Sequence, residues 1–364
     1  MLNIFSQEET NTGRQRELDY AKVISIVFMI IIHVWEKLSC YNVVAEAPEG
    51  FWQNFLQFGA GPLAAPVFMF CLGVGVLYTR HGSPAELARR GLLIFLGGYL
   101  LNFAREGIWQ YLLYKPEDIW ESDTIVYALL NGDILHFAGL AFLLTALLRA
   151  LHVPVWLVCV LAVLMLYQGE GLSEESELED RSRYFYGLFY YLKVASFPLL
   201  QWFVYPAFGM LFGQCLRHIT DKGKMYAVLL PATLAALFAL QNSAATEGFD
   251  ITSTYILQYD IYYQQEIFHF LYTISFILIE LSLLHFLTQS IEGSIDEAAL
   301  FIGKNLTGIY AVQWVLIGAI SYYQWTNDVD GFSATASTLL GLALAALSVL
   351  LAKVKSDLTS AFDK

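Results

Sequence analysis

Long apolar stretches separated by short polar segments run along almost the whole chain. A stretch of about 20 apolar residues is long enough to cross a bilayer as a helix. We expect ten such spans, near residues 18–38, 62–79, 90–114, 133–149, 153–168, 199–216, 225–242, 266–289, 300–323 and 333–352. The pattern therefore predicts an all-α fold, a polytopic membrane helix bundle.

Two segments interrupt this pattern. Residues 1–17 are polar, and residues 169–198 form a long connection between the fifth and sixth spans. Within that connection, residues 184–197 are aromatic and moderately apolar but short, which favours an interfacial helix over an eleventh span. We expect residues 1–364 to form a single transmembrane domain with a polar N-terminal segment and an extracytoplasmic loop that carries this helix.

The distribution of charge gives the predicted helices a direction, because Lys and Arg accumulate in short cytoplasmic loops. With both termini cytoplasmic, the inner segments hold most of the basic residues: Arg14, Arg16, Arg80, Arg89, Arg90, Arg149, Arg217, Lys222, Lys224, Lys353, Lys355 and Lys364. The opposite loops are acidic. Four basic residues on that side are exceptions: Lys37, Lys115, Arg181 and Arg183. We therefore expect both termini in the cytoplasm.

Composition supports a membrane protein and narrows its partners. The chain is 57% hydrophobic and only 15% charged, outside the range usual for soluble domains. Its formal net charge of -13 argues against a nucleic-acid partner, since binding to a phosphate backbone needs a basic face. The four cysteines have neither zinc-site nor disulfide-framework spacing, so we expect no bound metal.

The first predicted span carries three ionisable residues, Asp19, Lys22 and His33. The eleven residues from Lys22 to His33 make about three helical turns, so the two side chains share a face. Asp19 lies on that face too, and an i,i+3 ion pair with Lys22 is possible. His33 could act as a general base or carry an acyl group. The alternatives are a core histidine and an ion pair at the membrane boundary.

Arginines precede the third span, with Arg89 and Arg90 at its start. Guanidinium groups beside the positive end of a helix suit phosphate. The accumulation of basic residues in cytoplasmic loops explains these arginines equally well.

Other polar residues lie where lipid would not tolerate them. Asp133 and His136 share one face at the start of the fourth span, where they could orient an acceptor sugar or hold His33 in one tautomer. Helix capping by Asp133 is an equally simple account. The third, eighth and ninth spans also carry polar residues, which together imply a polar cavity between helices: Asn102, Arg105, Glu280, His285, Lys304, Asn305, Tyr310 and Gln313.

The sequence Leu18-Asp19, Lys22 and then His33 resembles the opening helix of the transmembrane acyltransferase superfamily, which includes the acyltransferase 3 family and heparan-alpha-glucosaminide N-acetyltransferase-like bacterial proteins. The family has arginine where this chain has Lys22, which keeps the charge but loses the bidentate fork. Residues 65–80 and 88–103 are similar to the family's second and third helices. Further segments resemble the fourth, sixth and ninth: GDILHFAGLAFLL, FPLLQWFVYPAFGMLFG and IGKNLTGIYAVQWVLI.

This resemblance implies an acyltransferase that takes an acetyl or other short acyl group from cytosolic acyl-CoA, acetyl-CoA above all. The acceptor would be a carbohydrate or similar hydroxyl or amine presented from the opposite side. The resemblance puts catalysis on His33, with Lys22 and Arg90 near the donor's phosphates. We add Asp19 and Lys22 to the catalytic residues and Arg89 to the residues that bind the donor.

We assign six residues to binding of the acceptor: Asn102, Arg105, Asp133, His136, Tyr310 and Gln313. We expect an integral protein of the bacterial inner membrane, with the lipid bilayer and a small-molecule or glycan acceptor as partners. A polytopic transporter or flippase is the alternative, because it would use the same intramembrane polar residues.

Overall fold

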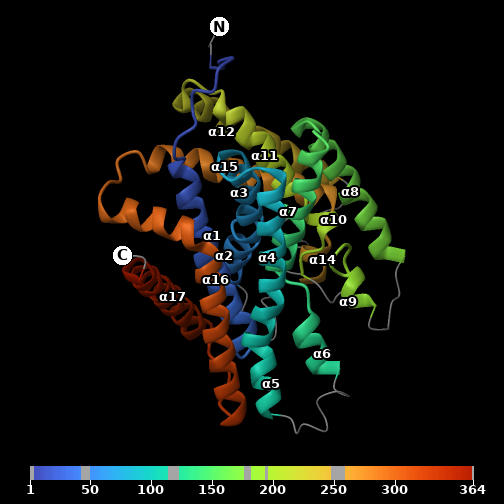
Figure 1. Ribbon diagram of the computed structural model, residues 1–364, viewed down its shortest axis with the longest axis vertical. Coiled ribbons are helices and arrows are strands. Elements are labelled where there is room, and N and C mark those ends of the chain that lie inside the picture. The colour runs from blue at the N-terminus through green and yellow to red at the C-terminus, as the bar shows by residue number, and fades with distance from the viewer. Residues whose placement is uncertain are drawn as a thin grey trace. The chain divides into compact units, whose positions relative to one another are not determined.

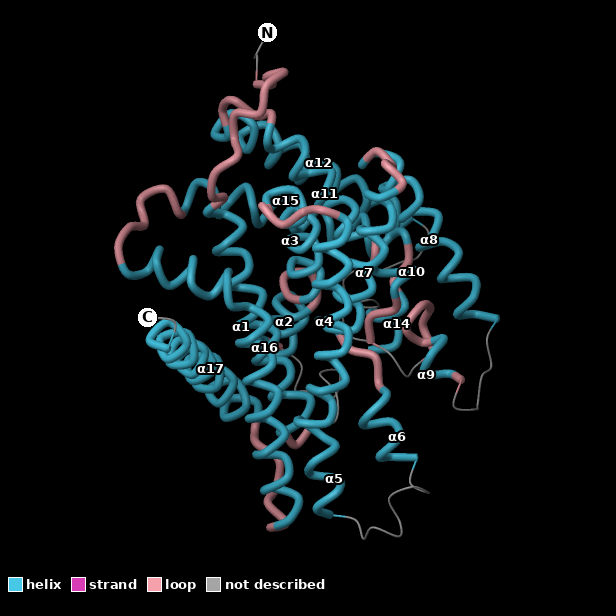
Figure 2. Tube along the Cα trace, viewed as in Figure 1, coloured by secondary structure: helices cyan, strands magenta, loops and turns pink. Residues whose placement is uncertain are grey.

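Helices make up the regular structure of the computed structural model, which describes residues 4–41, 50–113, 123–175, 182–192, 196–246 and 259–362 (Figure 2). Within these ranges the strand-like pairings are two isolated bridges, Phe5 with Ile219 and Ser39 with Phe332. The prediction of an all-α membrane fold is confirmed.

Figure 1 labels helices along the chain, and most of them follow apolar stretches of the sequence. Their bounds are α1 (Arg16–Leu38), α2 (Phe51–Ala60), α3 (Ala65–Tyr78), α4 (Pro84–Asn102), the π-helix η2 (Phe103–Gly107), α5 (Ile108–Leu113), α6 (Asp123–Leu130), α7 (Ile134–Ala150), α8 (Val155–Glu175), α9 (Arg183–Tyr186), α10 (Leu199–Trp202), α11 (Val204–Arg217), α12 (Lys222–Thr246), α14 (Tyr259–Gln264), α15 (Ile267–Leu287), α16 (Ser294–Thr326) and α17 (Ala334–Phe362).

Seven helices in the described part of the chain are long and apolar enough to cross a membrane: Arg16–Leu38, Asn54–Tyr78, Leu199–Arg217, Lys222–Ser243, Ile267–Leu287, Ser294–Thr326 and Ala334–Ser360. Two shorter apolar helices are Ile134–Ala150 and Val155–Gly169. The predicted count of ten is not confirmed. The third expected span, 90–114, is divided among α4, η2 and α5, and α4 carries three charged residues in its first two turns.

The long connection after α8 is only partly described. Helix α8 continues to Glu175, and the four-residue helix α9 lies within residues 184–197 apart from its first residue. Residues 176–181 and 193–195 lie outside the described ranges. The interfacial position of this segment stays a prediction, as does the single domain.

The chain divides into two compact units, which we describe separately. Unit 1 comprises Met1–Leu18, Pro66–Leu100 and Leu130–Gln289, and unit 2 comprises Asp19–Ala65, Leu101–Leu129 and Ser290–Lys364.

Unit 1 is built on pairs of packed apolar helices. Helix α12 packs on α15, while α8 packs on both α10 and α11. Buried aromatic side chains at the end of α10 and the start of α11 satisfy their polar atoms internally: Trp202 Nε1 donates to the carbonyl of Tyr263 at 2.9 Å, and the Tyr205 hydroxyl donates to Gln265 at 2.7 Å. These hydrogen bonds attach the short helix α14 to α10, and Gln265, which directly follows α14, to α11.

The polar N-terminal segment, which is part of unit 1, is held at the turn between α11 and α12. The amides of Ser6 and Thr10 donate to the carbonyls of His218 and Arg217 at 2.8 and 2.9 Å. At the end of this segment Glu17 is 1% exposed and accepts hydrogen bonds from Lys222 Nζ at 2.8 and 3.0 Å. The sequence predicted only the polarity of this segment, since its partner lies about 200 residues further along the chain.

Unit 2 packs α16 against α17, η2 and α5, and α1 against α17. Trp35 of α1 is buried and donates to Thr338 of α17 at 3.0 Å. A Cβ at Gly341 would lie 2.9 Å from the Cα of Ile31, so glycine lets these two helices approach closely. Helix α16 is kinked at Asn305, whose φ and ψ are -108° and 17°.

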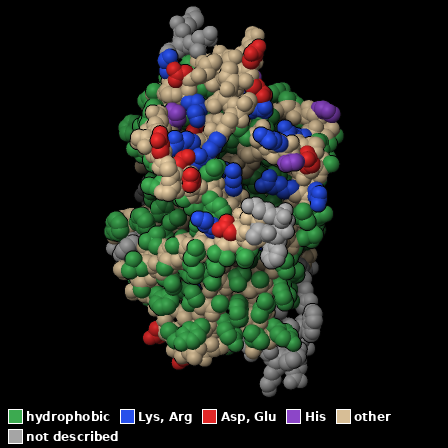
Figure 3. Space-filling model, turned by 60° about the vertical axis from the view of Figure 1, so that its left-hand side comes forward, with side chains coloured by type: hydrophobic (Ala, Val, Ile, Leu, Met, Phe, Trp, Pro, Cys, Tyr) green, Lys and Arg blue, Asp and Glu red, His purple; other side chains and the backbone are tan. Residues whose placement is uncertain are grey.

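Large hydrophobic side chains are exposed along several helices. On α4 they are Leu92, Leu93, Leu96 and Leu100, and on α17 they include Leu339, Leu342 and Leu350. Figure 3 shows a broad field of hydrophobic side chains on one face. Exposed apolar surface on this scale is unfavourable in water and suits contact with lipid tails, as expected for an integral membrane protein.

Candidate functional site

His33 of α1 lies against one face of α16 in unit 2. Its Nδ1 is 3.2 Å from Nε2 of Gln313, and its ring stacks on Trp314 with centroids 4.2 Å apart. Tyr310 meets the imidazole edge-on, with centroids 5.9 Å apart. The three α16 residues have i, i+3 and i+4 spacing, which places them on one helical face. Two residues predicted from the sequence, Tyr310 and Gln313, are thus brought to His33.

Arg105 reaches the same cluster from η2. Its side chain is 4% exposed, and the guanidinium carbon lies 4.5 Å from the ring centroid of Trp314, a cation–π contact. The π-helix changes the direction of side chains relative to α4, and such segments are frequent at functional sites. Trp314 therefore contacts both the imidazole of His33 and the guanidinium of Arg105.

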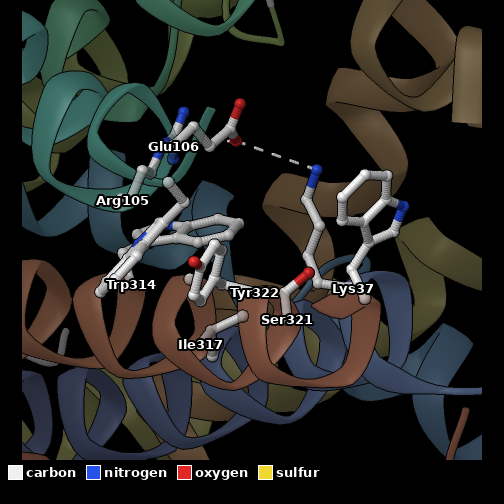
Figure 4. A pocket seen from close by; sticks show the side chains of 10 residues that line it. Lys37, Arg105, Glu106, Trp314, Ile317, Ser321 and Tyr322 are labelled. Carbon is white, nitrogen blue, oxygen red and sulfur yellow. Dashed lines mark ion pairs between the residues drawn. The ribbon is translucent and has the colours of Figure 1, made fainter. Parts of the chain in front are cut away.

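A cavity of about 280 Å³ opens beside this cluster (Figure 4). It is lined by Lys37, Arg105, Glu106, Trp109, Trp314, Ile317, Gly318, Ser321, Tyr322 and Trp325. Trp314 both stacks on His33 and lines this cavity, so the imidazole lies one side chain away from it.

The cavity is lined by one carboxylate, two cationic side chains and several aromatic rings. One oxygen of Glu106 is 3.7 Å from Arg105 Nε and 4.0 Å from Lys37 Nζ, the pair joined by a dashed line in Figure 4. Trp109 stacks on Tyr322 with centroids 5.1 Å apart. Flat aromatic surfaces with a few charged groups suit a polar ligand that has apolar faces, as sugars have.

Several of these cavity residues were not predicted from the sequence. Lys37 appeared only as an exception to the charge rule, and Glu106 and Trp314 were not singled out. One signal was available, because Lys37 follows His33 by four residues and therefore shares its helical face. No comparable signal marked Trp314, since an aromatic residue in an apolar span is usually only part of the core.

Asp19 and Lys22 form an ion pair one turn apart on α1, with Nζ and Oδ1 separated by 3.6 Å. Asp19 is 7% exposed, and a Cβ at Gly303 of α16 would lie 2.9 Å from its Oδ1. Along the helix axis, at 1.5 Å per residue, Lys22 is about 16 Å and Asp19 about 21 Å from His33. The structure therefore shows the ion pair that spacing predicts, and the catalytic assignment of its members stays a prediction.

Asn102 connects two helix ends in unit 2. Its side chain is buried, and Nδ2 donates to the carbonyl of Leu129 at 3.1 Å. This hydrogen bond joins the C-terminal end of α4 to that of α6. The role of Asn102 in acceptor binding stays a prediction.

Asp133 and His136 belong to unit 1, where they cap α7. Oδ1 of Asp133 accepts from the amide of Ile134 at 2.6 Å, and Nδ1 of His136 accepts from the amide of Asp133 at 3.0 Å. This is a capping box with histidine in the third position. The capping account of Asp133 is confirmed, while a contact of either residue with the acceptor or with His33 stays a prediction.

Arg89 and Arg90 lie near the start of α4 in unit 1, and both are exposed. The guanidinium carbon of Arg90 is 4.6 Å from the ring centroid of Phe142. Ser83 and Glu86 already cap this helix, because the Ser83 hydroxyl donates to Glu86 at 2.6 Å. The hydrogen bonds from Ser83, and then that from His81, hold the pKa of Glu86 at about 2. Phosphate binding here would therefore depend on the guanidinium groups more than on the helix start.

At Gly318 the backbone of α16 lies close to η2, which leads to a first prediction. A Cβ there would lie 2.2 Å from the carbonyl oxygen of Arg105. We expect Gly318→Ala to lower the free energy of unfolding by about 1–3 kcal/mol, because the π-helix must shift to admit the methyl group. Gly308→Ala on the same helix is the matched control, since a Cβ there meets nothing within 4 Å. Thermal unfolding midpoints in detergent would measure both; equal midpoints would contradict the prediction.

Comparison with known proteins gives one family match. A family model described as heparan-alpha-glucosaminide N-acetyltransferase, catalytic, matches residues 14–242. No curated relative matches the chain. The matched region contains His33, Arg89, Arg90 and Arg105, whereas α16 with Gln313 lies beyond it.

Proposed function

Because the chain belongs to the heparan-alpha-glucosaminide N-acetyltransferase catalytic family, we propose that it transfers an acetyl group from acetyl-CoA to an amine of a saccharide, with a hydroxyl as the other possible acceptor. Membership identifies a membrane enzyme of the N-acetyltransferase type. The observation that supports the finer assignment is the position of His33, stacked on a tryptophan that also lines the aromatic cavity.

His33 is the proposed base. The acceptor nitrogen attacks the carbonyl carbon of the thioester, and the imidazole takes a proton from that nitrogen. A carbon–nitrogen bond forms and the carbon–sulfur bond breaks, so that coenzyme A leaves as a thiolate and is then protonated. An acetyl group carried on the imidazole itself is the second route.

The cavity beside Trp314 is the proposed acceptor site. Trp109, Trp314 and Tyr322 offer aromatic faces for a sugar ring, and Glu106 offers a carboxylate to an ammonium group. The family model carries the name of an alpha-glucosaminide, which is an amino sugar, and this agrees with a carboxylate in the cavity. Under the predicted topology the cavity lies toward the extracytoplasmic side, since Lys37 follows His33 along α1.

The donor is proposed to enter from the cytosol. Under the predicted topology Asp19 and Lys22 lie at the cytosolic end of α1, and Arg89 and Arg90 lie at the cytosolic start of α4. The guanidinium groups of Arg89 and Arg90 would bind the phosphates of coenzyme A. The bacterial inner membrane, which offers cytosolic acetyl-CoA and an outer acceptor, is the proposed location.

One experiment tests this function directly. Purified protein in lipid nanodiscs is incubated with acetyl-labelled acetyl-CoA and glucosamine, and we expect label to appear on the amine of the sugar. N-acetylglucosamine, whose amine is blocked, and glucose, which has no amine, are the matched acceptors that separate N-transfer from O-transfer. Absence of transfer, of hydrolysis and of acetyl-CoA binding would contradict the proposal.

A transporter or flippase is the second candidate, and one observation favours it. Helix α16 is interrupted at Asn305, and α4 passes into the π-helix η2. Transporters often build their binding sites from interrupted membrane helices. Uptake of a labelled amino sugar by proteoliposomes without any acetyl-CoA would support this second function over the first.

A further inference from the structure

The side-chain amide of Gln313 is the hydrogen-bonding neighbour of His33 on α16. Gln313 is completely buried, and its Nε2 lies 3.2 Å from Nδ1 of His33. In this orientation the other end of the amide, Oε1, accepts no hydrogen bond from the described residues. Rotation of the amide by about 180° about its last bond exchanges oxygen and nitrogen in almost the same space.

The orientation of this amide favours one of the two imidazole tautomers over the other. When the amide nitrogen donates to Nδ1, the lone pair on Nδ1 is occupied and the proton lies on Nε2. When Oε1 faces Nδ1, it accepts the Nδ1–H, and the lone pair lies on Nε2. Only the second arrangement gives the imidazole a nitrogen that can take a proton from the acceptor.

The stacking partner of His33 restrains the same ring in a second way. Trp314 follows Gln313 directly and stacks on the imidazole at 4.2 Å with an interplanar angle of 30°. Rotation of the imidazole out of this plane would lose the stacking contact. Helix α16 can therefore set both the plane of the ring and its tautomer.

This inference rests on the proposed role of His33 as the base. We propose that Gln313 is a positioning residue whose Oε1 accepts the Nδ1–H of His33, which holds the basic lone pair on Nε2. Transfer of a proton from the acceptor to Nε2 then forms an imidazolium whose Nδ1–H still donates to the amide.

Two variants of Gln313 separate positioning from packing. Gln313→Leu removes the acceptor with little change in volume, and we expect kcat for acetyl transfer to fall roughly 10- to 100-fold with KM for both substrates nearly unchanged. Gln313→Glu keeps an oxygen that accepts the Nδ1–H, so we expect it to restore most of the loss. Gln324→Leu is the matched control, because Gln324 of α16 is also buried and its Nε2 donates to Leu38 at 3.3 Å.

The tautomer itself can be measured without turnover. In protein labelled with ¹⁵N-histidine, the resonances of His33 are identified as those that are missing from the spectrum of His33→Ala. We expect the Nδ1–H tautomer in the unmodified protein and a shift toward Nε2–H in Gln313→Leu. An Nε2–H tautomer in the unmodified protein, or equal kcat values for the Leu and Glu variants, would overturn the proposal. Undiminished transfer by His33→Ala would instead overturn the proposed function, while the ¹⁵N spectrum still decides the role of Gln313.

Discussion

Replacement of His33 by alanine is expected to lower the rate of acetyl transfer by roughly 10²- to 10⁴-fold, the usual contribution of a positioned general base. The imidazole is held by Gln313 at 3.2 Å and by stacking on Trp314 at 4.2 Å, so the variant removes a positioned base. The measurement is kcat for transfer of labelled acetyl from acetyl-CoA to glucosamine. A variant that folds and transfers at the unmodified rate would exclude His33 as the base.

The controls for this variant separate chemistry from folding. His285→Ala removes another histidine from a membrane helix, one that packs on Tyr226 with centroids 4.7 Å apart in unit 1. We expect this variant to retain nearly full activity. Unfolding midpoints of both variants show whether each is folded. A label that stays on the unmodified protein after incubation with acetyl-CoA alone, and is missing from His33→Ala, would identify the acetyl-imidazole route.

Replacement of Lys222 by methionine is expected to lower the free energy of unfolding by about 3 kcal/mol, because it leaves a carboxylate buried without its cation. Glu17 is 1% exposed and accepts from Lys222 Nζ at 2.8 and 3.0 Å. The Tyr226 hydroxyl donates to the same carboxylate at 3.1 Å but brings no compensating charge. Denaturant unfolding of the purified protein would measure the loss.

A lysine two residues further along α12 is the matched control. Lys224 pairs with Asp221 at 2.9 Å, but both side chains are largely exposed, so Lys224→Met should cost less than about 1 kcal/mol. A second test combines Lys222→Met with Glu17→Gln, which removes the buried charge and should recover much of the loss. Equal destabilisation by Lys222→Met and Lys224→Met would contradict the buried ion pair.

The sequence by itself determined the helical membrane fold and the face of α1 that carries His33. Both are local properties, since the length of an apolar stretch and the spacing of residues along one helix need no knowledge of distant segments. The same reasoning predicted Tyr310 and Gln313 as polar residues at membrane depth, and both contact His33. Capping of α7 by Asp133 was equally local, and the structure confirms it.

Only the tertiary structure decided which side chains surround His33 and where a ligand has room. Arg105 contacts Trp314 because η2 is a π-helix and because Gly318 leaves room for the carbonyl group of Arg105. Neither condition follows from the regular spacing of residues along an α-helix. Lys37, an exception to the charge rule, lies near Glu106 at 4.0 Å and lines the cavity. Such contacts join residues far apart in sequence, and their geometry depends on how whole helices pack against each other.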